Sequence, residues 1–172
     1  IGRGTKLETG VVIENGVVIG QRCKLDTRVI IRGGSAEPEF TSIGSDCQLQ
    51  AHAHLGCTCR LGDRVRIGSG VFLGNQVQIH HDAQLMANVV VHDSASIGCH
   101  SVVKILASVE KDLPPYSVFA GNPAESRGVN IIGLQQENFP RAIIEALMHA
   151  HRLIYRESKP LEEARHVPRA GH

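Results

Sequence analysis

A strict six-residue period is the feature of this sequence that most limits how the chain can fold. An aliphatic residue returns at every sixth position in two long runs. The first run comprises Ile1, Leu7, Ile13, Ile19, Leu25 and Ile31, and the second comprises Ile43, Leu49, Leu55, Leu61, Ile67, Leu73, Ile79, Leu85, Val91, Ile97, Val103 and Val109. Four residues after most of them stands a small residue, such as Cys23, Ala53 or Val65. An amphipathic helix repeats every ~3.6 residues and a lone strand every two, so neither explains this period.

Three short strands per turn explain the period. Three hexads form one triangular coil in which both repeating positions point inward, and successive coils pair as parallel strands. The pattern therefore predicts a mainly β protein, a left-handed parallel β-helix that extends over residues 1–124. Gly often follows the aliphatic position, as at Gly44 and Gly62, where we expect a turn that needs a permissive backbone.

The repeat is interrupted once and then ends. The phase jump between Ile31 and Ile43 leaves residues 37–42 as an extra segment, which predicts an extruded loop that preserves the register. Beyond a Pro-rich stretch that closes the repeat, residues 125–172 are predicted to form a C-terminal helical segment. Apolar residues at helical spacing after Pro140 predict one helix of about four turns, and residues 160–167 predict a shorter one.

Charge and hydropathy exclude several classes of partner. The chain carries 18 basic and 17 acidic side chains, so no field of one sign attracts nucleic acid. No apolar run approaches the ~18 residues that a membrane-spanning helix needs, so we expect no integral membrane segment. These features predict a cytoplasmic protein that binds neither nucleic acid nor membrane.

The cysteines and histidines divide according to the repeat. Cys23, Cys47 and Cys59 fall on the small inward position and are expected to be buried apolar residues, whereas Cys57 and Cys99 face outward. Six of the ten His residues also fall on outward positions. They are His52, His54, His80, His81, His92 and His100. An imidazole that titrates near neutral pH can remove a hydroxyl proton during acyl transfer.

The segments that follow the repeat are more specific than the repeat itself. They are Pro114-Pro115-Tyr116, Gly121-Asn122-Pro123-Ala124, Gly128-Val129-Asn130-Ile131-Ile132-Gly133-Leu134 and Leu153-Ile154-Tyr155-Arg156. Together they resemble the acyl-(acyl carrier protein)–UDP-N-acetylglucosamine O-acyltransferase family, which begins lipid A synthesis, and the similarity covers residues 19–164. The resemblance implies a homotrimer with active sites between neighbouring β-helices. It also implies transfer of a 3-hydroxyacyl group from acyl carrier protein to the sugar, with no metal or cofactor.

Some functional residues of the family have counterparts in this chain. His54 resembles the substrate-binding His that precedes the catalytic base, His92 resembles a second active-site His, and Asn130 resembles an Asn that binds the nucleotide. The base itself should stand where this chain has Cys57. We therefore take His54 and Cys57 as the catalytic candidates.

Other positions depart from the family. Gln76 stands in place of another active-site His, and Asp93 stands in place of a Gln. Ile132 and Gln136 replace an acidic and a basic group that help to hold the nucleotide. The candidates for substrate binding are His92, Asp93, Gln76, Asn130 and Gln136.

These departures leave alternatives open. A cysteine thiol is a nucleophile more readily than a base, and His52, His54 or His81 could act as the base in a reshaped cleft. One reading is an acyltransferase that acts on UDP-N-acetylglucosamine or a related nucleotide sugar. The alternative is a catalytically inactive paralogue that serves as a trimeric binding or assembly module. A third reading is a metal site between subunits, which would draw on His52, His54, His81 and His92.

Overall fold

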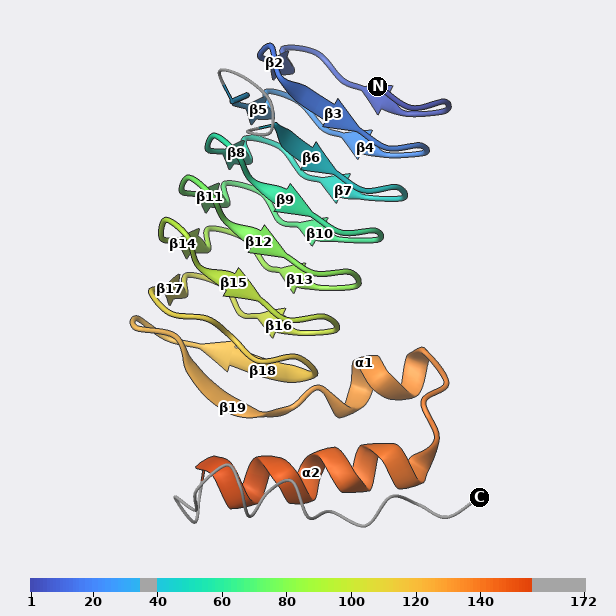
Figure 1. Ribbon diagram of the computed structural model, residues 1–172, viewed down its shortest axis with the longest axis vertical. Helices are drawn as coiled ribbons and strands as arrows, with labels where there is room; N and C mark the ends of the chain where they lie inside the picture. Colours follow the sequence, from blue (N-terminus) through green and yellow to red (C-terminus); the bar gives the residue numbers. More distant parts are fainter. Residues whose placement is uncertain (35–39, 156–172) are drawn as a thin grey trace.

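The chain forms a parallel β-helix that is followed by a hairpin and two helices. The computed structural model describes residues 1–34 and 40–155. Triangular coils stack from the N-terminus, and both helices lie at the far end of the stack (Figure 1). This arrangement confirms the parallel β-helix that the six-residue period predicts.

Three sheets form the sides of the prism. The first sheet contains, in order, β1 (Lys6–Leu7), β4 (Lys24–Leu25), β7 (Gln48–Leu49), β10 (Arg66–Ile67), β13 (Gln84–Leu85), β16 (Val102–Val103), β18 (Ser117–Ala120) and β19 (Glu125–Val129). The second contains β17 (Ser108–Val109), β14 (Val90–Val91), β11 (Phe72–Leu73), β8 (His54–Leu55), β5 (Ile30–Ile31) and β2 (Val12–Ile13). The third contains β15 (Ser96–Ile97), β12 (Gln78–Ile79), β9 (Arg60–Leu61), β6 (Thr41–Ile43) and β3 (Val17–Ile19). We call them sheets A, B and C.

The interior follows the predicted register. Every aliphatic repeat position from Ile19 to Val109 is buried, and so are those of its small partners that the structure describes, such as Cys47 and Ala53. Ile1 and Leu7, by contrast, are 68% and 45% exposed, and both lie in the first coil that the structure describes. The inward pattern is therefore confirmed from Ile19 onward.

The glycines have a different role from the one we expected. Gly44 and Gly62 do not have a positive φ, because the left-handed backbone falls two residues later, on Asp46 (φ 61°) and Arg64 (φ 57°). A Cβ on Gly44 would lie 2.6 Å from the carbonyl carbon of Gly62. These glycines therefore allow close contact between successive coils, whereas the corner after them supplies the turn.

Two residues of the predicted loop belong to the regular repeat instead. Thr41 and Ser42 belong to β6, and Thr41 pairs in register with Val17. Thr41 is fully buried in the small inward position, and its hydroxyl donates to the carbonyl of Arg32 over 2.6 Å. The strand captures these residues because Thr is small enough for the interior. The remainder of the predicted loop falls largely outside the described residues.

The C-terminal segment begins with a strand, not with a helix. Residues 125–129 form β19, which pairs antiparallel with β18 and extends sheet A. Helix α1 (Ile131–Gln136) follows, then α2 (Arg141–Tyr155), which confirms the helix expected after Pro140. The shorter helix predicted over residues 160–167 lies outside the described part of the chain. Neither described helix has the length and hydropathy that a membrane crossing requires.

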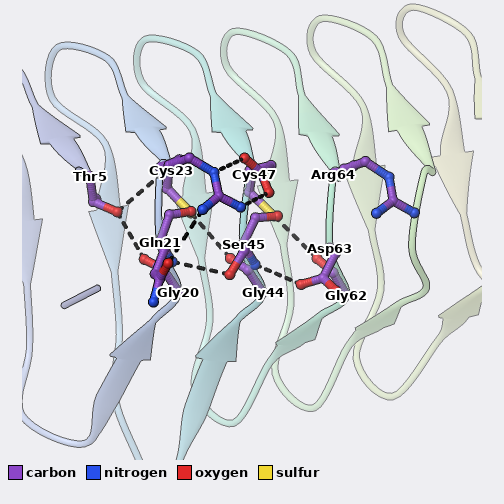
Figure 2. Close-up of polar contacts among 12 residues, drawn as sticks. Thr5, Gly20, Gln21, Cys23, Gly44, Ser45, Cys47, Gly62, Asp63 and Arg64 are labelled. Carbon is purple, nitrogen blue, oxygen red and sulfur yellow. Dashed lines mark hydrogen bonds and ion pairs between the residues drawn. The ribbon is translucent and has the colours of Figure 1, made fainter. Parts of the chain in front are cut away.

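The three inward cysteines are buried at two edges of the prism: Cys23 and Cys47 stack between sheets C and A, and Cys59 lies between sheets B and C. Their Sγ atoms lie 3.1 Å from the carbonyl oxygens of glycines in the next coil. Figure 2 shows Cys23 and Cys47 in this arrangement, beside Gly44 and Gly62. Burial raises the pKa of Cys47 to about 12 and that of Cys59 to about 11. These two thiols therefore remain protonated at neutral pH.

We expect iodoacetamide at pH 8 to separate the two classes of cysteine. Cys57 and Cys99 are partly exposed, so they should be alkylated in the folded protein. Because Cys23, Cys47 and Cys59 are buried and the reagent cannot reach them in the folded protein, they should react at least about 100-fold more slowly. Peptide mass spectrometry over a time course measures both rates, and labelling in guanidinium is the control in which all five should react. Equal rates in the folded protein would contradict the burial of these three cysteines.

Candidate active site

A groove along the corner between sheets B and C brings three of the predicted residues together. It has a volume of about 460 Å³ and is lined by Gly33, Gly34, Cys57, Thr58, Asn75, Gln76, Asp93 and Ser94. Cys57 follows β8, and Asn75 and Asp93 occupy the same corner position in the next two coils. The stacked register therefore places Cys57, Gln76 and Asp93 along one wall.

Hydrogen bonds between coils fix this wall. The backbone N–H of Cys57 donates to Asn75 Oδ1 over 3.0 Å, and the N–H of Asn75 donates to Asp93 Oδ1 over 2.8 Å. The hydroxyl of Ser94 donates to Gln76 Oε1 over 3.2 Å. Asn75 was not among the residues predicted from the sequence, although its spacing from Cys57 and Asp93 gave a usable signal. These bonds hold the backbone of the groove in one geometry.

His54 lies on the outer face of sheet B. Its ring stacks on Phe72 with the ring centroids 5.0 Å apart. Nδ1 of His54 is buried and has no hydrogen-bond partner among the described residues. Burial lowers the pKa of His54 below its ordinary value of 6.5, and the positive charge of Arg32 lowers it further. The imidazole is therefore neutral at pH 7, as a general base must be.

His92 lies just after β14, and its Nε2 is 3.2 Å from the hydroxyl of Ser108. Within the single chain, neither His92 nor His54 lines the groove that contains Cys57. A buried polar atom without a partner calls for an explanation, and a catalytic role is one such explanation. The unpartnered nitrogen of His54 thus distinguishes it from His92.

Asn130 and Gln136 lie elsewhere, at the two ends of helix α1. They line a hollow of about 400 Å³ over sheet A, together with Arg64, Arg66 and His100 among others. Asn130 is the N-cap of α1: its Oδ1 accepts from the N–H of Gly133 over 3.2 Å, and its Nδ2 donates to the carbonyl of His100 over 2.9 Å. Helix α1 lies within the predicted C-terminal helical segment but was not singled out, although an Asn ahead of it is a typical N-cap signal. Within one chain, Asn130 and Gln136 therefore lie outside the groove that contains Cys57.

Comparison with known proteins accounts for both parts of the chain. The family described as "Udp N-acetylglucosamine O-acyltransferase; Domain 2" matches residues 112–169, and "Bacterial transferase hexapeptide (six repeats)" matches residues 40–75. A curated acyl-[acyl-carrier-protein]–UDP-N-acetylglucosamine O-acyltransferase from Burkholderia mallei is 33% identical over 150 residues, which cover 87% of this chain. The chain belongs to this acyltransferase family.

Solved structures agree with this assignment. The UDP-N-acetylglucosamine acyltransferase of Bacteroides fragilis is 26% identical with a TM-score of 0.91, over 98% of this chain and 73% of that one. The Francisella novicida enzyme is 25% identical with a TM-score of 0.86, over 95% and 72%. These relatives are left-handed β-helices, which confirms the predicted fold class. The chain spans 57% of the length of the Burkholderia acyltransferase, a little over half.

The segments that match known families contain candidate residues from both sites. The family match over residues 112–169 includes Asn130 and Gln136, and the hexapeptide match includes His54 and Cys57. The two nucleotide candidates thus lie in the segment that matches this family's model, and the two catalytic candidates lie in the segment that matches the hexapeptide repeat.

Proposed function

We propose that this protein transfers a (3-hydroxy)acyl group from acyl carrier protein to UDP-N-acetylglucosamine or a related nucleotide sugar. The observation that carries the proposal is the rigid groove that joins Cys57, Gln76 and Asp93. The named activity of the Burkholderia relative supports this donor and this acceptor. The location that we propose for this reaction is the cytoplasm.

In this proposal His54 is the general base. Its neutral imidazole accepts the proton of the sugar hydroxyl while the oxygen attacks the thioester carbonyl. The tetrahedral intermediate then collapses, and the imidazolium returns the proton to the departing thiolate of the carrier protein. Cys57 lies in the groove beside the reacting groups, in the position that the family gives to its base. Gln76, Asp93 and His92 contribute polar contacts to the substrates.

The reaction needs a second copy of the chain in this proposal, because one subunit keeps the groove apart from Asn130 and Gln136. The outer face of sheet B supports this requirement, since its apolar side chains are between 36% and 49% exposed. They are Val12, Ile30, Phe72 and Val90. Strand register places them in one row, with His54 between Ile30 and Phe72. A contiguous apolar row marks a protein contact.

We therefore propose a homotrimer in which a neighbouring subunit covers this row and encloses His54. The neighbour would bring its own Asn130 and Gln136 toward the nucleotide of the bound acceptor. Because Asn130 already uses both ends of its amide within the chain, it acts there mainly by positioning α1.

The direct test of this function is an acyl-transfer assay. Purified protein, confirmed as a trimer by sedimentation, is incubated with 3-hydroxyacyl carrier-protein thioesters of several chain lengths and with UDP-N-acetylglucosamine. Mass spectrometry should detect the acylated sugar nucleotide and the free carrier thiol in equal amounts. A trimer that forms no product from any thioester, with this acceptor or with a 3-amino analogue, would refute the proposal.

A further inference from the structure

Two histidines and an aspartate form a compact cluster at the corner between sheets C and A, away from the groove. His81, Asp82 and His100 each offer one ligand atom, and these atoms lie within 4.8 Å of one another. Nδ1 of His81 is 2.8 Å from Asp82 Oδ2, and Nε2 of His100 is 3.7 Å from the same oxygen. Ligand atoms in a tetrahedral zinc site with bonds of about 2.1 Å are about 3.4 Å apart. The cluster therefore already spans the distances that such a site requires.

We propose that His81, Asp82 and His100 bind a divalent transition-metal ion, with Zn²⁺ the best match. Two imidazoles and one carboxylate suit zinc and its neighbours in the first transition row, whereas Mg²⁺ and Ca²⁺ prefer oxygen donors alone. The site belongs to a single chain. It thus differs from the site between subunits that the sequence left open.

The coil geometry holds the three ligands in place. Asp82 and His100 occupy the same left-handed corner position of successive coils, with φ of 59° and 54°. The N–H of His100 donates to the carbonyl of His81 over 3.2 Å, which joins the two coils at this point. The ring of His100 packs against Tyr116 and Phe139, with centroids 5.6 Å and 5.1 Å away. His100, whose nitrogen lies farther from Asp82 Oδ2 than that of His81, is therefore held in place by ring packing.

Arg64 is the main opposing charge. Its Nε lies 2.6 Å from Asp82 Oδ1, and its Nη2 lies 2.7 Å from Oδ2. A carboxylate offers about four lone-pair sites, so the bond to Oδ1 can persist while a metal takes Oδ2. Carboxylates that bind metals are commonly oriented by a hydrogen bond of this kind. Arg64 thus orients the ligand, while its charge limits the affinity for a cation.

Remaining coordination positions can be filled from the hollow beside α1. Asp82 and His100 line that hollow, which has a volume of about 400 Å³ and admits water or an anion. Metal sites with three protein ligands generally keep such an open position. A bound metal would also link the coil that carries Asp82 to the next coil, where His100 packs against Tyr116 and Phe139.

Metal titration of the full chain tests the proposal. Protein stripped with a chelator and then freed of it is titrated with Zn²⁺ by calorimetry and with Co²⁺ by absorption spectroscopy. We expect one ion per chain that depends on this cluster, and a Co²⁺ spectrum with nitrogen and oxygen ligands. The thermal unfolding midpoint should rise with Zn²⁺, because the ion binds the folded state.

Three substitutions decide whether the cluster is responsible. His81→Gln and His100→Gln should each weaken Zn²⁺ binding at least about tenfold, as removal of metal-site groups does elsewhere. His80→Gln is the matched control, since His80 is an exposed neighbour outside the cluster, and it should leave the affinity unchanged. His81 is also exposed, so His81→Gln should not compromise folding. No binding at millimolar Zn²⁺, or binding that both cluster variants retain, would overturn the proposal and leave a hydrogen-bonded link between coils.

Discussion

Cys57→His is expected to raise the rate of acyl transfer by about a hundredfold, within the range that a positioned general base contributes. Cys57 lies on the wall of the groove with Gln76 and Asp93, whereas His54 does not line that groove within one chain. An imidazole at this position would therefore add a proton acceptor in the groove itself to the one that His54 supplies. Initial rates with a carrier-protein thioester and UDP-N-acetylglucosamine, measured at subsaturating concentrations, give the change in kcat/KM.

Two further variants separate this effect from a change in packing. Cys57→Ser keeps the size of the side chain without an imidazole, and Cys57→Ala removes the thiol; both should stay close to the starting protein. Activity abolished in Cys57→Ala would mean that the thiol itself takes part, and our account of this position would be wrong. If Cys57→His folds correctly but kcat/KM does not rise, the rate is limited instead by weak binding of the nucleotide, where Ile132 and Gln136 replace charged groups.

The coils could be predicted from the sequence because a solenoid repeats its own environment. Once the period is known, each inward position follows, and Leu73 and Ile97 are fully buried as predicted. The role of the glycines could not be predicted in the same way. Only 2.6 Å would separate a Cβ on Gly44 from the backbone of the next coil. Such closeness is a property of stacked backbones, and a period along one chain does not reveal it.

The candidate site could be predicted only where the same register governs it. Cys57, Gln76 and Asp93 meet because their corners stack, whereas the position of Asn130 depends on the β18–β19 hairpin. That hairpin reverses the chain and delivers α1 to the face of sheet A, through pairing that has no periodic signal. The unpartnered nitrogen of His54 was equally invisible, because its burial depends on the three-dimensional surroundings of the ring, which the period does not specify.

His54→Gln is expected to lower kcat/KM by about two to three orders of magnitude, because the amide cannot accept and return a proton as imidazole does. Burial lowers the pKa of His54 below 6.5, so the neutral, basic form persists to lower pH than it would in a free histidine. Activity should therefore fall on the acid side only as pH drops through this lowered pKa. In His54→Gln the residual activity should not show this fall at low pH, which we call the acid limb of the pH profile.

The matched control is His52→Asn, in the same coil. His52 is exposed and has a φ of 62°, a conformation that Asn tolerates, so this variant should keep both the rate and the acid limb. A His54→Gln protein that retains both would exclude His54 as the base and direct attention to His92. Loss of rate together with the acid limb requires a titrating group at His54, because a purely structural role would lower the rate and leave the pH profile in place.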